Sequence, residues 1–365
     1  MRYLLKDILI PQPKSKIKAG EGKKEGEYKF FTSSIEQTKF IDIYNYDKEA
    51  LIFGTGGNAN VHYCDTLFST STDCIVMYTE KDIELKLIYY YLKNNIHLLE
   101  DGFKGAGIKH ISKDYILNLS IDLPLKCEQK NILKVIENAE NIILNRKQQL
   151  LKLDELVKSR FIKLFGNILC DNNLPLVELK ELADIGSSKR IYANEYVESG
   201  VPFYRSKEIR ELGTGLKPSV ELFIKQERYE EIKAKYGVPK IGDILIAAIG
   251  ATIGYSWIVD TDKPFYYKDG NLIILSIKNN VNPIFLNHTM GILIEDFKSK
   301  GVAGSAQLAL TIEKLEKMMV VNPSIDHQNQ FATFVEQTDK SKSAVQKSLE
   351  QLETLKKSLM QQYFG

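Results

Sequence analysis

Apolar residues recur at steps of three and four along two long stretches of the chain, a pattern typical of one face of an α-helix. The positions in the first stretch are Ile132, Ile136, Ala139, Ile143, Leu150, Leu153, Val157 and Leu164. Those in the second stretch are Phe331, Val335, Val345, Leu349, Leu352, Leu355 and Leu359. Each stretch lies between a proline and a glycine and contains neither residue in its interior. The pattern predicts a helix from about residue 128 to residue 164, ~55 Å long at ~1.5 Å per residue, and a second such helix at the end of the chain.

The two stretches are copies of one another. The segment from Pro124 to Gly166 aligns without a gap with the segment from Pro323 to Gly365, at an offset of 199 residues. Ten of the 43 aligned positions are identical, where average composition gives roughly two or three. The identical pairs are Pro124/Pro323, Gln129/Gln328, Glu137/Glu336, Leu150/Leu349, Leu153/Leu352, Leu156/Leu355, Lys158/Lys357, Ser159/Ser358, Phe165/Phe364 and Gly166/Gly365.

A single helix of this length cannot bury its own apolar stripe. We therefore expect the two copies to pack against each other as an antiparallel coiled-coil pair. The alternative is that each helix packs only on its own domain. We favour the pair, because ~55 Å exceeds the width of a domain of ~120 residues.

A region with mixed strand and helix patterns precedes each predicted long helix. Strands are expected at residues 50–53, 74–78, 244–248 and 272–277, and helices at residues 83–94, 225–234 and 283–297. The two regions resemble each other weakly. Residues 50–57 align with residues 243–250. Residues 26–31 align with residues 199–204.

These elements predict a pseudo-twofold internal repeat of a globular region followed by a long helix. The expected fold class is α+β, with two α/β domains separated by two long antiparallel helices that form a coiled coil. The expected boundaries are residues 1–124 for the first domain, 125–166 for the first long helix, 167–175 for a linker, 176–323 for the second domain and 324–365 for the second long helix. Asp171, Asn172 and Asn173, with Pro175 after them, are typical of such a linker.

Composition narrows the class of protein. With 44% hydrophobic and 26% charged residues, the chain is expected to form large cores. The net charge is only +2, so a phosphate-binding surface has to be a local patch. The four cysteines form no C-x-x-C pair, which favours a reducing cytoplasm and argues against a disulfide framework. Neither a signal-peptide pattern nor an apolar run of ~18 residues occurs in the sequence.

Motifs for catalysis are not found in the sequence. Residues 54–59 match G-x-G-x-x-A after a predicted strand, but strand and turn patterns follow them, so we interpret the glycines as a tight turn and not as a dinucleotide site. There is no G-x-x-x-x-G-K-[ST], no H-E-x-x-H and no Asn-Pro-Pro-aromatic motif, and the five histidines are scattered. The sequence therefore predicts no catalytic residue and no metal site.

Basic and polar clusters are the candidates for nucleic-acid contact, because lysine and arginine bind phosphates while arginine and small polar side chains read base edges. The first 34 residues carry eight basic and four acidic side chains. The predicted DNA contacts are Lys14, Lys16, Lys23, Lys24, Lys29, Ser33, Lys104, Lys109, Lys189, Arg190, Tyr204, Arg205, Lys207 and Gln307. A solvated surface or an ordinary loop is the alternative for each cluster.

In the order of its motifs, the chain resembles the specificity subunits of type I restriction–modification systems. In the second half, the resemblance rests on the sequences VELKELADIGSSKR, GVPFYRSKEI, GDILIAAIGATIG and KDGNLIIL. In both halves it includes a proline, a glutamine shortly after it and a long helix that ends in Phe-Gly. The resemblance covers nearly the whole chain.

The resemblance implies that each globular region is a target-recognition domain for one half of a bipartite, asymmetric DNA target, and that the helix pair fixes the gap between the halves. It implies two methyltransferase subunits and motor-nuclease (restriction) subunits as partners. S-adenosylmethionine, ATP and magnesium would belong to those partners, so no cofactor and no catalysis are expected in this chain. Two other classes stay open: a single-chain nuclease or methyltransferase, and a coiled-coil scaffold with two protein-binding domains.

Overall fold

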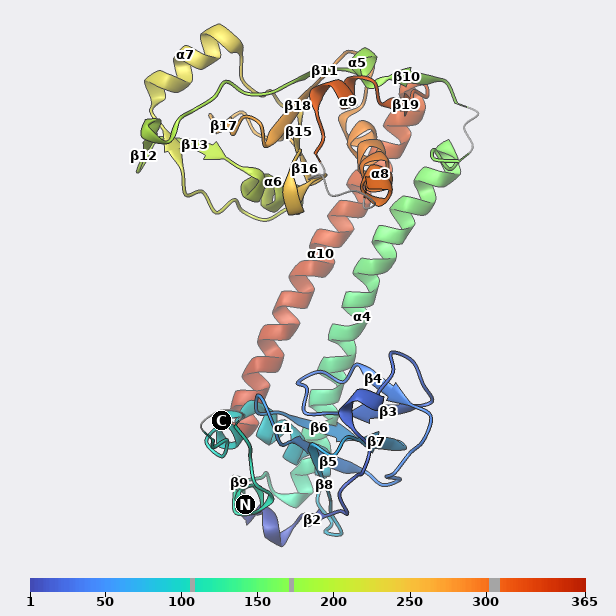
Figure 1. The fold of residues 1–365 in the computed structure, drawn as a ribbon, viewed down its shortest axis with the longest axis vertical. Coiled ribbons are helices and arrows are strands. Elements are labelled where there is room, and N and C mark those ends of the chain that lie inside the picture. Colours follow the sequence, from blue (N-terminus) through green and yellow to red (C-terminus); the bar gives the residue numbers. More distant parts are fainter. Residues whose placement is uncertain (106–108, 171–173, 302–308) are drawn as a thin grey trace. The chain divides into compact units, whose positions relative to one another are not determined.

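The computed structural model describes residues 1–105, 109–170, 174–301 and 309–365 (Figure 1). The chain forms two compact units. The first unit consists of Met1–Gln149 and Ala344–Gly365, and the second consists of Leu150–Ser343. The two long helices are α4 (Lys126–Phe165) and α10 (Ile325–Phe364), which keep the offset of 199 at both ends. Each unit contains a part of both helices. The boundaries expected from the sequence kept each long helix as one undivided segment.

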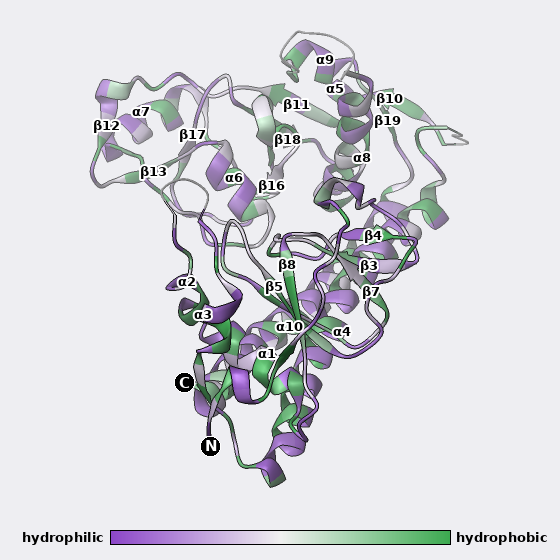
Figure 2. Ribbon diagram, turned by 60° about the horizontal axis from the view of Figure 1, so that its bottom comes forward, coloured by the Kyte–Doolittle hydropathy of each residue, from purple (hydrophilic) through white to green (hydrophobic). Residues whose placement is uncertain are grey.

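The core of the first unit consists of a β-sheet, a helix and the turns near the start of the chain. Its strands and remaining helices are β1 (Arg2–Leu4), β2 (Ile10–Pro11), β3 (Tyr28–Phe31), β4 (Lys39–Ile41), β5 (Ala50–Gly54), β6 (Val61–Cys64), β7 (Phe68–Thr70), β8 (Cys74–Tyr78), α1 (Leu85–Asn94), α2 (His97–Glu100), α3 (Lys113–Leu117) and β9 (Ser120–Asp122). The main sheet has the order β2-β8-β5-β6. Strands β5 and β8 are hydrophobic along their lengths (Figure 2), and Leu51, Met77 and Ile88 are fully buried between sheet and helix.

The second unit repeats this plan at larger size. Its strands and remaining helices are β10 (Leu176–Glu178), α5 (Leu179–Leu182), β11 (Ala183–Gly186), β12 (Tyr196–Val197), β13 (Val201–Tyr204), α6 (Ser206–Gly213), β14 (Phe223–Ile224), α7 (Gln226–Tyr236), β15 (Ile244–Ala247), β16 (Ser256–Ile258), β17 (Tyr266–Tyr267), β18 (Leu272–Ile277), α8 (Pro283–Gly301), α9 (Ile312–Glu316) and β19 (Met319–Val321). Its main sheet has the order β11-β18-β15-β16, and β13 pairs in parallel with β17 as β3 does with β7. All seven strands and helices expected from the sequence are present, with bounds that differ by a few residues.

Two inserted helices explain why the second unit is larger. Residues 32–38, between β3 and β4, contain no helix, whereas residues 205–222, between β13 and β14, contain α6. Residues 42–49 also contain no helix, whereas residues 225–243 contain α7. The second unit therefore carries surface that has no counterpart in the first.

Helices α4 and α10 run antiparallel in both units, which confirms the predicted pairing. In the first unit, Lys147 Nζ lies 3.0 Å from Glu353 Oε1, and Lys356 Nζ lies 2.6 Å from Glu140 Oε1. In the second unit, Lys342 Nζ lies 2.7 Å from Asp154 Oδ1. The helix ends bury aromatic residues: Phe364 packs with Ile132 and α1 in the first unit, and Phe165 packs with Phe331 and α8 in the second.

The repeated glutamine performs the same task in both units. Gln129 accepts a hydrogen bond from the backbone N–H of Glu84 (3.2 Å) and donates one to the carbonyl of Pro124 (3.2 Å). Gln328 accepts from the N–H of Asn282 (2.9 Å) and donates to the carbonyl of Pro323 (2.9 Å). Both side chains are 1% exposed. Each glutamine therefore joins the start of a long helix to the start of α1 or α8, and this glutamine clasp explains why proline and glutamine recur at fixed spacing.

No helix in the described ranges is both long and apolar enough to cross a membrane.

Candidate nucleic-acid interface

Three loops of the first unit meet through backbone hydrogen bonds. The N–H of Thr55, after β5, donates to the carbonyl of Asp73 (2.9 Å). The N–H of Ile111, before α3, donates to the carbonyl of Thr55 (3.2 Å), and the N–H of Ser71 donates to the carbonyl of Phe31 (2.8 Å). We call this meeting of the loops after β3, β5 and β7 and before α3 the loop junction. It brings residues from four distant parts of the sequence to one place.

The second unit has a loop junction with the same hydrogen bonds. The N–H of Ala248 donates to the carbonyl of Asn271 (2.8 Å), the N–H of Leu310 donates to the carbonyl of Ala248 (2.9 Å), and the N–H of Lys268 donates to the carbonyl of Tyr204 (2.9 Å). Ala248 thus corresponds to Thr55, and Tyr204 corresponds to Phe31. Both correspondences are those of the weak alignments of residues 50–57 with 243–250 and of residues 26–31 with 199–204.

The glycine-rich turn after β5 is held from inside by Asn60. This side chain is 5% exposed; it accepts from the N–H of Gly54 (3.2 Å) and donates to the carbonyl of Ser33 (3.0 Å). A Cβ at Gly54 would lie 2.5 Å from Asn60 Nδ2, and Gly57 has a φ of +83°, so both positions favour glycine. The turn is a structural one, as the sequence predicts.

Ser33, a predicted DNA contact in the loop after β3, is bonded to this turn. Its hydroxyl donates to the carbonyl of Asp73 (2.7 Å) and accepts from the N–H of Gly56 (3.4 Å). These bonds use its hydrogen and one of its two lone pairs, so Ser33 helps to fix the turn.

Two of the predicted lysines lie at the first loop junction. Lys104 and His110 exchange two backbone hydrogen bonds of 3.0 Å, and His110 Nδ1 lies 3.1 Å from the carbonyl oxygen of Thr55. The side chains of Lys104 and Lys109 are exposed. The junction therefore presents two cations beside a polar turn, an arrangement suited to phosphate.

The other basic residues of the first unit are spread over its surface. The other predicted DNA contacts among them are Lys14, Lys16, Lys23, Lys24 and Lys29, and all five are exposed. Lys23 Nζ lies 2.6 Å from Asp42 Oδ2, and this hydrogen bond and the charge of Lys23 lower the pKa of Asp42. The structure does not join these five lysines into one site.

In the second unit, Lys189 and Arg190 lie on a loop fixed to the junction. The N–H of Lys189 donates to the Tyr266 hydroxyl (2.6 Å), and Arg190 Nε donates to Asp269 Oδ2 (2.7 Å). Asp269 lies in the junction loop after β17. Lys189 and Arg190 are exposed. Both therefore stay DNA-contact candidates at this end of the unit.

Three further candidates already have partners within the protein. Tyr204 is 8% exposed and stacks on Phe265 with ring centroids 5.0 Å apart, so it belongs to the core. Arg205 begins α6, where its guanidinium binds the buried Glu208 (2.9 Å) and Glu221 (2.8 Å). Lys207 Nζ lies 2.6 Å from Glu221 Oε1. Hydrogen bonds from Lys207 and Arg205 lower the pKa of Glu221 to about 2, so these charges neutralise one another within the protein.

The remaining candidate, Gln307, lies outside the described residues, as do the linker residues Asp171, Asn172 and Asn173. Two residues that sequence reasoning missed, Lys235 and Tyr236, end α7. The expected helix stopped at residue 234 and so excluded them. The sequence contained a sign of a later helix end, since Lys233, Lys235 and Tyr236 stand directly before Gly237, and basic residues followed by a glycine are typical of a helix C-terminus.

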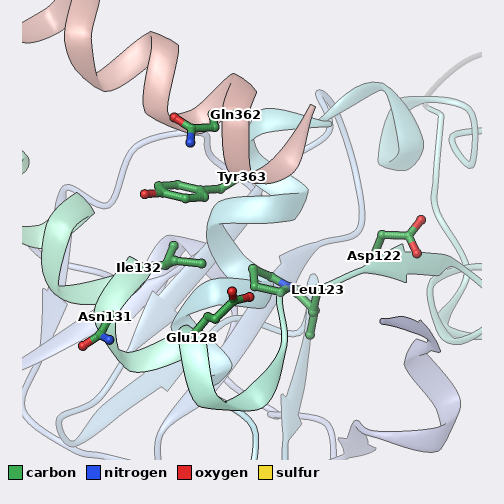
Figure 3. A pocket seen from close by; sticks show the side chains of 8 residues that line it. Asp122, Leu123, Glu128, Asn131, Ile132, Gln362 and Tyr363 are labelled. Atoms are coloured by element: carbon green, nitrogen blue, oxygen red, sulfur yellow. The ribbon is translucent and has the colours of Figure 1, made fainter.

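A pocket of about 500 Å³ in the first unit has a different character (Figure 3). It is lined by Asp122, Leu123, Pro124, Glu128, Asn131, Ile132, Gln362 and Tyr363. Two carboxylates and two amides suit a cationic group and repel phosphate. At the offset of 199, Glu128 corresponds to His327 and Gln362 corresponds to Lys163. The acidic character of the pocket is therefore not repeated at the equivalent positions of the second unit. Across the described ranges, no three His, Cys, Asp or Glu side chains gather as metal ligands would.

Comparison with known proteins covers nearly the full chain. The family described as the type I restriction modification DNA specificity domain matches residues 2–153 and 173–354. The chain is similar to the type I restriction enzyme MjaVIII specificity subunit of Methanocaldococcus jannaschii, with 27% identity over 92% of this chain and 85% of that protein.

Two solved structures share the fold. The S subunit of a type I restriction-modification system from M. genitalium matches with a TM-score of 0.67 and 18% identity, over 100% of this chain and 96% of that one. A chain from a structure of the assembly and conformational transition of the type I R-M system matches with a TM-score of 0.59 and 14% identity, over 100% and 97%. On the strength of the family match, which falls once on each half of the chain, this protein belongs to the family of type I restriction–modification DNA specificity subunits.

Proposed function

We propose that the two units each recognise one half of a bipartite, asymmetric DNA target, so that the chain selects the sequence on which a type I restriction–modification enzyme acts. The observation that carries the proposal is the repeated loop junction. Two units with the same sheet order and the same junction hydrogen bonds occur within one chain of this family. Two DNA-binding units that are similar but not identical, on one chain, are suited to two different half-sites.

Affinity and sequence choice come from different side chains in this proposal. Exposed lysines such as Lys104, Lys109 and Lys189 contact phosphates, which positions the protein but carries no sequence information. Polar side chains on the junction loops read the base edges. The chain itself performs no catalysis and holds no cofactor. S-adenosylmethionine, ATP and magnesium serve the methyltransferase and restriction subunits.

The long helices set the gap between half-sites and dock two methyltransferase subunits. Support for docking comes from large apolar side chains of α4 that are exposed on each unit: Ile142 (43%) and Leu144 (53%) on the first, Leu151 (65%) on the second. On α10, Leu355 is 51% exposed. Exposed apolar side chains of this size are available to pack against a partner subunit.

The test is to express the chain together with its methyltransferase subunit and to map methylated bases in the host genome. The proposal expects one split motif, methylated only when both chains are present. Methylation at a contiguous motif, or the same motif without this chain, would refute it. A mobility shift of labelled duplex by the purified assembly separates DNA binding from a purely protein-binding scaffold.

The spacing role has its own test. Four residues inserted after Asn145 of α4 and after Ala344 of α10, which are equivalent positions, keep the two helices matched in length. We expect the gap in the methylated motif to lengthen while both half-sites stay the same. Four alanine substitutions at the same places are the control. An unchanged gap in the insertion variant would contradict the role of the helices as a spacer.

A further inference from the structure

The second unit carries an exposed tyrosine with two lysines against it. Tyr236, the last residue of α7, is 53% exposed. Lys189 Nζ lies 5.4 Å from the centroid of its ring, and Lys235 Nζ lies 5.8 Å from the same centroid. We call Lys189, Lys235 and Tyr236 the lysine–tyrosine patch.

Neither ammonium group of the patch forms an ion pair with a carboxylate in the described part of the chain. An aromatic ring attracts a cation through its face, but it does not neutralise the charge. The negative end of the α7 dipole offsets only about half a charge. Two ammonium groups beside one ring thus leave an uncompensated positive charge, which a bound anion would neutralise.

The patch is preformed. On one side, the N–H of Lys189 is fixed by the Tyr266 hydroxyl, and the neighbouring Ile191 is 5% exposed. On the other side, Tyr229 and Ile232 anchor α7 in the core. Gly237 follows with a φ of +78°, which ends the helix directly after Tyr236. Both sides of the patch therefore have their main chain held in place, and an anion binds without reordering it.

We infer that the lysine–tyrosine patch binds a backbone phosphate of DNA at the half-site that the second unit recognises. This inference rests on the proposed function and adds residues to it. Lys189 and Lys235 supply two charge-assisted hydrogen bonds to the phosphate oxygens. The patch replaces Arg205 and Lys207, whose charges Glu208 and Glu221 neutralise, as the phosphate contact of this unit. Because α7 has no counterpart in the first unit, the contact is made on one half of the target only.

The test measures DNA affinity of the assembly with methyltransferase subunits across a range of salt concentrations. Each phosphate contact contributes about 0.9 to the slope of log affinity against log salt. We expect the Lys189→Ala, Lys235→Ala double variant to reduce the slope by about one and to weaken binding roughly fivefold, and each single variant to reduce the slope by a part of that amount. Lys233→Ala is the matched control, since Lys233 is exposed on the same helix but is not paired with the tyrosine ring. Its slope and affinity should equal those of the wild type.

Phosphate-ethylation interference locates the contact. In the wild type, we expect interference at phosphates of one half-site, and the Lys189→Ala, Lys235→Ala double variant should lose the signal there and nowhere else. Melting temperatures confirm that the variants fold. Equal slopes for Lys235→Ala, Lys233→Ala and the wild type would overturn the patch while the proposed function stands. Absence of DNA binding by the wild-type assembly would overturn both.

Discussion

The two units attach their globular parts to the helix pair by different chemistry at equivalent positions. Tyr90 lies six residues after the backbone N–H of Glu84 that its glutamine clasp binds, and His288 lies six residues after that of Asn282. The Tyr90 hydroxyl donates to Glu140 (2.7 Å), which also accepts from Lys356 (2.6 Å). The His288 ring instead contacts the rings of Phe161 and Phe331, whose centroids lie 4.9 Å and 5.1 Å from its own. Its Nε2 has no hydrogen-bond partner among the described residues.

The difference teaches that one docking geometry can be stabilised by a polar network or by aromatic packing. Burial raises the pKa of Glu140, but the hydrogen bonds from Lys356 and Tyr90 outweigh it, and the net pKa is lowered. Burial lowers the pKa of His288, and the charges of Lys158 and Lys342 act in the same direction, so that together they bring this pKa to about 4. The first unit therefore holds a charged group at this contact, and the second holds a neutral one at pH 7.

A substitution at Phe161 should have the largest effect that is confined to one unit. This ring is 1% exposed and contacts Phe165, Phe285 and Phe331. We expect Phe161→Ala to lower the free energy of unfolding of the second unit by about 3–5 kcal/mol, through lost burial and a cavity. Trp257, the only tryptophan, is 4% exposed in the second unit, so its fluorescence in a urea titration reports that unit. Met360→Ala, at the equivalent place in the first unit, is the control. Equal shifts of the Trp257 transition in both variants would contradict a unit-specific role.

The glutamine clasp should behave alike in both units. Replacing Gln129 or Gln328 by leucine keeps the volume but leaves a buried backbone N–H and a carbonyl without partners. Each replacement should cost roughly 1–3 kcal/mol. The two costs should agree within error when hydrogen exchange is measured at α1 and at α8. A clear difference between the two free-energy costs would mean that the repeat preserves the glutamine but not its contribution to stability.

The smallest effect concerns pH. The folded-state pKa of His288 lies below that of an unfolded histidine, ~6.5. The unfolded chain then binds more protons at pH 4–6.5, so stability falls as the pH falls through this window. At pH 5.5 the loss should be about 1 kcal/mol in the wild type. His288→Phe removes it. Urea titrations at pH 7.5 and 5.5, followed through Trp257, measure the difference. The same loss in His288→Phe would assign it to other groups.

Much of the fold follows from the sequence because its signals are local or repeated. The stripe from Ile132 to Leu164 fixes α4 to within two residues at either end, and the repeat at Pro323 then fixes α10. The division of each helix between two compact units does not follow, because it depends on which residues touch in space. Lys147 and Glu353 are far apart in sequence, and no local pattern shows that they pair.

The candidate site could be predicted only in outline. Lys104, Lys109 and Lys189, which the sequence suggested as basic residues on loops, have exposed side chains near the loop junctions and stay predicted DNA contacts. The same reasoning gave Arg205 a free charge, because Glu221, which neutralises it, lies sixteen residues further along the chain. Burial of Tyr204 was equally invisible, since alternation along a strand predicts one buried residue of two neighbours, whereas Phe203 and Tyr204 are both buried.

The hydrogen bonds that the two loop junctions share join main-chain atoms, and side chains such as Ser33 and Asn60 add to them in the first unit. A substitution at Thr55 or Asp73, or at Ala248 or Asn271, removes neither the N–H nor the carbonyl that holds the loops together. Side chains on these loops are thus free to change identity while the frame beneath them persists. A protein built in this way can acquire a new DNA preference by point changes at its surface, without having to evolve its architecture again.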